Sequence, residues 1–121
     1  LCSPARMKRF LDDIDSPNVE VILDGVNLIH PNETAPEAQA RVIGQAFEYY
    51  GDRISALHMK DFVFDGENQI FKHVGEGLFN YEPFMKLIKE KKPYIPMLLE
   101  NSDRERFHED VAFLQEVFDR V

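Results

Sequence analysis

The sequence predicts an α/β fold in which parallel βα units form part of a larger sheet. Three apolar strand candidates alternate with four amphipathic helix candidates along the 121 residues, in the order αβαβαβα. Such alternation implies right-handed crossovers and parallel strands with helices outside. Since parallel strands need cover on both faces, three strands with four helices suit a small open sandwich or a piece of a barrel.

The four helices are predicted from capping residues followed by apolar residues at helical spacing. The second and fourth starts also have a glutamate three residues later, which is the capping-box pattern, and the first is followed directly by proline. The predicted helix starts are Ser3, Thr34, Asn80 and Ser102.

The strands are predicted from short apolar runs, at residues 19–23, 54–60 and 95–99. Pro96 must lie at the start of the third strand or where no ladder N–H is needed. Residues 62–74 are predicted to leave the sheet as a segment with a polar tip, which turns at Asp65 and Gly66.

Composition restricts the classes of function. The chain has the size of a single domain, residues 1–121, and its 14 basic and 22 acidic residues give a net charge of −8. That charge argues against nucleic acid as a partner, and no apolar run is long enough to span a membrane.

Cys2 is expected to be an inert thiol, and a single cysteine suits a reducing cytoplasm. A start without methionine suggests a piece of a longer protein.

A polar residue stands at the carboxyl end of each predicted strand: Asp24, His58 and Glu100. Taken alone, Asp24 is most simply a turn former and His58 a hydrogen-bonded core residue. Their equivalent placement in three successive βα units instead favours one shared site. One Asp, one His and one Glu form a ligand set suited to Mn²⁺, Mg²⁺, Co²⁺ or Zn²⁺, with donor atoms about 3 to 6 Å apart.

Three further polar residues receive weaker predictions. Lys60 points to the same side of its strand as His58 and could neutralise a substrate oxygen or phosphate, although a solvated lysine is an equal alternative. His30 and His73 fall in predicted loops and are expected to be exposed rather than functional.

Four motifs in order resemble the sugar phosphate isomerase/epimerase superfamily, the xylose isomerase-like TIM barrels that also include endonuclease IV-type enzymes. The motifs are VILDGVNL at residues 21–28, LHMKD at 57–61, VGEG at 74–77 and LLE at 98–100. The likeness runs from about Ser3 to Val121. It implies the C-terminal part of an eight-stranded barrel, with Asp24 on strand six, His58 on strand seven and Glu100 on strand eight.

The resemblance also implies a function. It makes Asp24, His58 and Glu100 ligands of one divalent metal, and Glu100 one of two glutamates that move a proton next to a carbonyl, with no organic cofactor. The other glutamate is expected upstream of Leu1. Asn27 stands where some ketose epimerases carry a substrate-binding histidine, so it is a substrate-binding candidate together with Lys60.

Three functional alternatives stay open at this stage. The leading one is a fragment of a metal-dependent isomerase or epimerase of a small sugar or sugar phosphate. The others are an endonuclease IV-like phosphodiesterase and an inactive barrel fragment. Apolar barrel edges are expected to drive self-association.

Overall fold

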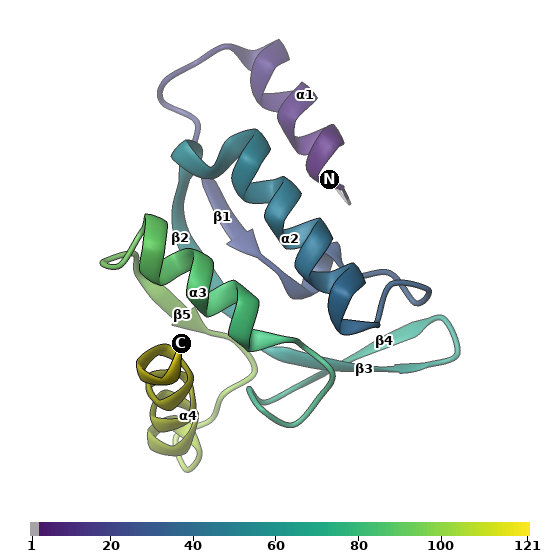
Figure 1. Ribbon diagram of the computed structural model, residues 1–121. Coiled ribbons are helices and arrows are strands. Elements are labelled where there is room, and N and C mark those ends of the chain that lie inside the picture. The colour runs from purple at the N-terminus through teal and green to yellow at the C-terminus, as the bar shows by residue number, and fades with distance from the viewer. Residues whose placement is uncertain (1–2) are drawn as a thin grey trace.

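Helices cover one face of a three-stranded parallel sheet, and a two-stranded hairpin extends from the end of the sheet (Figure 1). This computed structural model describes residues 3–121, so Cys2 lies outside the described residues. In chain order the helices and strands are α1 (Pro4–Ile14), β1 (Val21–Asp24), η1 (Val26–Leu28), α2 (Pro36–Tyr50), η2 (Gly51–Arg53), β2 (Ile54–Met59), β3 (Asp61–Asp65), β4 (Asn68–Lys72), α3 (Tyr81–Lys91), β5 (Met97–Leu99) and α4 (Phe107–Arg120).

The sheet has the strand order β1-β2-β5, and both pairs are parallel. Asp24 lies beside His58 in the first pair, and Leu98 lies beside His58 in the second. The predicted parallel arrangement is therefore confirmed. All three carboxyl ends meet at one edge of the sheet, where α/β folds collect their functional residues.

The strand ends differ slightly from the predicted ones. β1 begins two residues later than expected and includes Asp24 as its last residue, and β2 ends one residue early, at Met59. β5 begins at Met97 because Pro96 has no N–H to donate, although its carbonyl accepts a hydrogen bond from the Leu57 N–H at 2.9 Å.

The first two helix starts differ in which residue provides the cap. Ser3 caps α1 as predicted, since its Oγ accepts a hydrogen bond from the Arg6 N–H at 3.3 Å. The capping box at Thr34 is wrong: Ala35 is the N-cap and makes no side-chain cap. Pro36 at the first helical position sets this start, because its fixed φ already suits a helix.

The last two helix starts also use their polar residues differently from the prediction. Asn80 is the N-cap of α3, but its side chain donates to the Pro36 carbonyl at 3.4 Å instead of capping. The capping box at Ser102 is wrong, since α4 begins only at Phe107. The Ser102 hydroxyl donates instead to Asp110 at 2.6 Å, and Asp103 closes the turn that precedes the helix.

The core lies between the sheet and the helices. Alternation along the strands buries Val21, Leu23 and Leu57 against the helices, whereas Ile22 and Leu98 on the other face are 53% and 47% exposed. One face of the sheet is thus packed and the other is open. No helix within residues 3–121 is long and apolar enough to cross a membrane.

The excursion after β2 is the antiparallel hairpin of β3 and β4, which turns where the sequence predicts. Gly66 takes a positive φ of 60° in the two-residue loop, which suits glycine. The Gln69 side chain donates to the Val26 carbonyl at 3.1 Å, which ties β4 to the segment after β1. The hairpin therefore lies next to the carboxyl edge of the sheet.

Candidate metal centre

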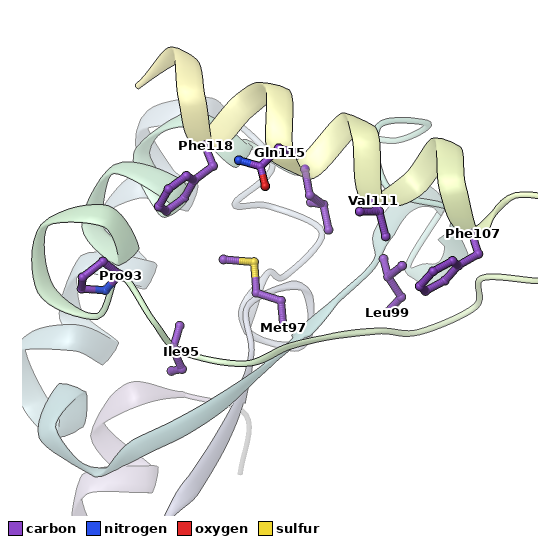
Figure 2. A pocket seen from close by; sticks show the side chains of 9 residues that line it. Pro93, Ile95, Met97, Leu99, Phe107, Val111, Gln115 and Phe118 are labelled. Carbon is purple, nitrogen blue, oxygen red and sulfur yellow. The ribbon is translucent and has the colours of Figure 1, made fainter.

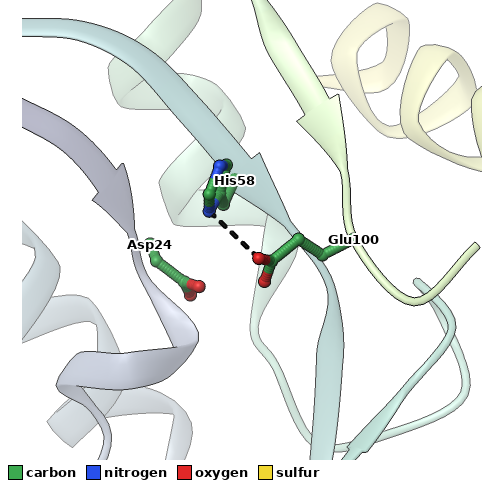
Figure 3. A group of neighbouring side chains, drawn as sticks. All are labelled: Asp24, His58 and Glu100. Carbon is green, nitrogen blue, oxygen red and sulfur yellow. Dashed lines mark ion pairs between the residues drawn. The ribbon is translucent and has the colours of Figure 1, made fainter.

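Asp24, His58 and Glu100 converge at the carboxyl edge of the sheet (Figure 3). Asp24 ends β1, His58 lies in β2, and Glu100 directly follows β5, so parallel pairing of the three strands brings the side chains together. One ligand atom from each residue lies within 4.8 Å of the others, and His58 Nδ1 lies 3.3 Å from Glu100 Oε1. This spread agrees with the sequence-based expectation for one shared site, and the role of these residues as ligands stays a prediction.

The donor set fits a divalent metal ion. Two ligands bound at about 2.0 to 2.3 Å can be up to roughly 4.6 Å apart, so these side chains need only small adjustments to share one ion. Carboxylate oxygens with one imidazole nitrogen suit Mn²⁺, Mg²⁺, Co²⁺ or Zn²⁺.

Lys60 lies between the two carboxylates of this group. Its Nζ is 2.7 Å from Asp24 Oδ2 and 2.8 Å from Glu100 Oε2, and its side chain is only 5% exposed. The ring of Phe71, on β4, lies 4.0 Å from the same ammonium. Lys60 thus belongs to the cluster and is not a solvated lysine, whereas its contact with substrate stays a prediction.

The charges within the cluster shift two pKa values in opposite directions. Burial alone would lower the pKa of Lys60, but hydrogen bonds and charge from Asp24 and Glu100 outweigh it and raise that pKa. The hydrogen bond from Lys60 lowers the pKa of Glu100 against the opposing effect of burial. Both shifts favour the charged forms, so the pair is ionised near neutral pH.

Asn27 holds the Asp24 carboxylate from the other side. Its backbone N–H donates to Asp24 Oδ1 at 3.3 Å, and its side-chain amide donates to Asp24 Oδ2 at 3.1 Å. η1 places it there because that short turn begins one residue after Gly25. Asn27 therefore orients Asp24, and substrate binding by this residue stays a prediction.

Asp61 is a residue of this region to which the sequence analysis assigned no role. Its fully buried carboxylate accepts three hydrogen bonds of 2.8 to 3.0 Å from backbone N–H groups. These donors are Phe62, Gly75 and Phe79. The sequence contained a signal for this residue: Asp61 is the last residue of the LHMKD motif and an acidic residue directly after a buried strand.

Tyr81 also supports the backbone of Lys60. Its hydroxyl donates to the Lys60 carbonyl at 2.7 Å. Burial raises the pKa of the Tyr81 phenol, and the charge of Asp61 acts in the same direction, so the hydroxyl keeps its proton. Asp61 and Tyr81 together hold the chain at the point where Lys60 enters the cluster.

His73 differs from its predicted role as an exposed loop residue. It is partly buried, and its Nδ1 lies 3.1 Å from the buried carboxylate of Asp110. The Ser102 hydroxyl donates to the same carboxylate oxygen at 2.6 Å. This three-residue contact joins the loop before α3 to the loop that follows Glu100. Because the serine and the histidine both contact Asp110 rather than each other, it is not a nucleophile–base pair.

An apolar cavity of about 360 Å³ lies between β5 and α4 (Figure 2). Met97 and Leu99 line its floor, and Val111 and Phe118 line it from the helix. Glu100 follows Leu99 and therefore points to the opposite side of the strand. The cavity belongs to the packing between sheet and helix and is separate from the metal centre.

The fold and the site together define an α/β protein with a ligand set at the carboxyl edge of a parallel sheet, as in TIM-barrel proteins. Residues 1–117 match the model of the xylose isomerase-like TIM barrel family, and the chain belongs to that family. The family includes sugar isomerases and endonuclease IV-like enzymes.

A solved structure supports the same fold. The chain resembles the xylose isomerase domain protein from Planctomyces limnophilus with a TM-score of 0.75 and 17% sequence identity. The match covers 98% of this chain and 42% of that chain. At this identity the likeness shows the fold alone. No curated protein sequence matches the chain.

Proposed function

We propose that this chain supplies three ligands of a divalent-metal-dependent sugar or sugar-phosphate isomerase or epimerase. The observation that carries the proposal is the convergence of Asp24, His58 and Glu100, within 4.8 Å, at the carboxyl edge of neighbouring parallel strands. Membership of a family that includes sugar isomerases supports it. In this proposal the strands β1, β2 and β5 are strands six, seven and eight of a barrel.

Glu100 is the acid–base group in the proposed reaction. Its lowered pKa keeps the carboxylate ionised, so that it can accept a proton from a substrate carbon next to a carbonyl. A bound divalent metal would supply Lewis-acid polarisation of the carbonyl oxygen. Lys60 would hold a substrate oxygen, and Asn27 would keep Asp24 oriented. Movement of a proton between opposite faces of a carbon needs a second acid–base group, which the resemblance assigns to another glutamate.

Metal binding is the first test of the proposal. Titration of the chain with Mn²⁺ in a calorimeter is expected to show weak binding at one site. Asp24→Asn and His58→Gln should each weaken it by about 10-fold or more, since each removes a ligand. Asp13→Asn, which changes an exposed carboxylate of α1, is the matched control and should leave binding unchanged. Equal binding by wild type and Asp24→Asn would contradict the proposal.

Hydrogen exchange tests the reaction class. We expect the chain alone, with metal, to leave ketoses and ketose phosphates unchanged, because its described residues place only one glutamate at the site. In a protein that joins this chain to the remaining barrel strands, substrate C–H hydrogen should exchange with deuterium from the solvent, and Glu100→Gln should abolish the exchange. Cleavage of DNA at abasic sites without such exchange would favour the endonuclease IV-like alternative, which the net charge of −8 disfavours.

A further inference from the structure

The Lys60 ammonium lies between the two carboxylates of the proposed metal centre. It contacts Asp24 Oδ2 at 2.7 Å and Glu100 Oε2 at 2.8 Å, and the Phe71 ring closes a third side at 4.0 Å. With 5% of its side chain exposed, Lys60 is nearly removed from water. Two carboxylates and an aromatic face thus replace the water shell of this ammonium.

A divalent metal and this ammonium would both draw on the negative charge of the same two carboxylates, Asp24 and Glu100. A metal bound at about 2.0 to 2.3 Å from Asp24 and Glu100 would lie within roughly 5 Å of an ammonium that kept its present contacts. Two cations so close repel each other, although solvent at the partly exposed His58 and Glu100 weakens the repulsion. The carboxylates therefore favour one cation over the simultaneous presence of both.

Lys60 is not needed to orient Asp24 or to place the Glu100 backbone. Asn27 already donates to both oxygens of Asp24, at 3.3 and 3.1 Å. The Glu100 backbone is held by its own N–H, which donates to the Met59 carbonyl at 2.9 Å. Removal of the lysine side chain would leave these supports in place.

We infer that Lys60 is the internal counter-ion of the metal-free protein and that it competes with the divalent metal for Asp24 and Glu100. This inference rests on the proposed function, because it takes Asp24, His58 and Glu100 as the metal ligands. It adds to that function an exchange of the Lys60 ammonium for the divalent metal at the two carboxylates. Lys60 holds the two carboxylates together without metal and gives them up when metal binds. The Phe71 ring, 4.0 Å from the ammonium, is itself 44% exposed, so the ammonium lies one ring away from solvent.

The test compares Mn²⁺ affinity in wild type and Lys60→Met by calorimetry. Methionine keeps an unbranched side chain but removes the competing charge, so Mn²⁺ should bind about 10-fold tighter or more. Lys86→Met removes the same charge from an exposed position of α3 and should change the affinity less than about twofold. Lys60→Met should also unfold at a lower temperature than wild type in EDTA, yet gain more from added Mn²⁺.

A measurement on the wild-type chain does not depend on the folding of the variant. Reductive methylation with labelled formaldehyde, followed by peptide mapping, reports how accessible each lysine is. Saturation with Mn²⁺ should raise the methylation of Lys60 and leave that of Lys86 unchanged. Equal or lower methylation of Lys60 with metal would overturn the inference.

The outcomes separate the inference from the proposed function. Equal Mn²⁺ affinity in wild type and Lys60→Met would overturn the competition while leaving the metal site in place. Weaker binding by Lys60→Met would show that the lysine supports the metal, which also overturns the inference. Absence of Mn²⁺ binding in both proteins would overturn the inference and the proposed function together.

Discussion

Asp61 shows how a single buried charge can organise the backbone beside the candidate site. The carboxylate is fully buried, and backbone N–H groups from three separate positions replace the water that it loses on folding. Two of the positions lie in the segment between the hairpin and α3, so the carboxylate joins that segment to the end of β2. A residue of this kind acts on the site through neighbouring Lys60 rather than by contact with substrate.

Loss of the Asp61 carboxylate is expected to destabilise the chain strongly. Asp61→Ala leaves two buried N–H groups, of Phe62 and Phe79, without an acceptor, each costing about 1 to 3 kcal/mol, so the free energy of unfolding should fall by about 2 kcal/mol or more. Asp61→Asn keeps one acceptor oxygen and should cost less. Urea unfolding measures both, with Asp13→Ala on the surface as control. A loss below about 1 kcal/mol for Asp61→Ala would contradict this account.

Tyr50, the last residue of α2, makes stability sensitive to alkaline pH. Burial raises its pKa from 10.0 to about 12 in the folded chain. The unfolded chain therefore loses this proton first, and the contribution of Tyr50 to stability is complete below pH 10 and lost as the pH rises towards 12. This loss is on the order of 2 kcal/mol.

Variants of two tyrosines test the alkaline prediction. Tyr50→Phe cannot ionise and should lose less stability than wild type between pH 10 and 12 in urea unfolding series. Tyr94 is 97% exposed, so Tyr94→Phe should keep the wild-type pH dependence. A Tyr50→Phe curve parallel to the wild-type curve would assign the alkaline loss to other groups.

At the scale of elements, the connections position the candidate site as much as the strands do. The segment between the hairpin and α3 packs so closely that a side chain on Gly77 would overlap the Phe62 carbonyl oxygen and the Asp61 carboxylate. Across the molecule, the contact of His73 and Ser102 with Asp110 joins this segment to the loop after Glu100. The segment before α3, which contains His73, and the loop after Glu100, which contains Ser102, are therefore both joined to α4 through Asp110.

Two glycine-to-alanine changes should have opposite effects. Gly77→Ala needs a backbone shift beside Asp61, so we expect a loss of about 2 kcal/mol or more. Gly44 lies inside α2 with open space around its Cα, and Gly44→Ala should stabilise the chain by about 0.5 to 1 kcal/mol. Thermal unfolding of both variants measures the difference. Equal effects of the two changes would show that the close approach at Gly77 is unimportant.

At the scale of the whole molecule, the described chain leaves one face of its parallel sheet open. Ile22 and Leu98 are half exposed on that face, on the same side as the metal centre. β1 and β5 each pair with only one strand of the described sheet. Parallel sheets are normally covered on both faces, so this surface is suited to further strands or to another molecule.

We propose that the chain in isolation associates with itself through this open face and its edges. Sedimentation velocity over a range of concentrations should show species larger than the monomer. Ile22→Glu should shift the distribution towards monomer, because it introduces a charge on the open face. Ile14→Glu changes a similarly exposed residue on α1 and is the control. A monomer at all concentrations would contradict the proposal.

Much of the fold could be predicted because it depends on local rules. Apolar runs and capping residues indicated the four α-helices and the three parallel strands, though not the short helices η1 and η2, and the turn at Gly66 followed from glycine's freedom to take a positive φ. The errors were at element ends, where two residues compete for one role. α2 begins at Pro36, so Thr34 does not cap it. The Ser102 hydroxyl donates to Asp110 and therefore does not cap α4.

The sequence by itself determined which side chains could form the site, because strand order and the period of a strand bring Asp24, His58 and Glu100 to one edge. Only the tertiary structure decided what surrounds them. Lys60 contacts carboxylates 36 and 40 residues away in the chain, and no local pattern specifies such a contact. The burial of Asp61 likewise depends on the backbone N–H groups of Gly75 and Phe79, which folding brings from 14 and 18 residues further along the chain. Partners distant in sequence are selected by packing and charge, which act only once the chain has folded.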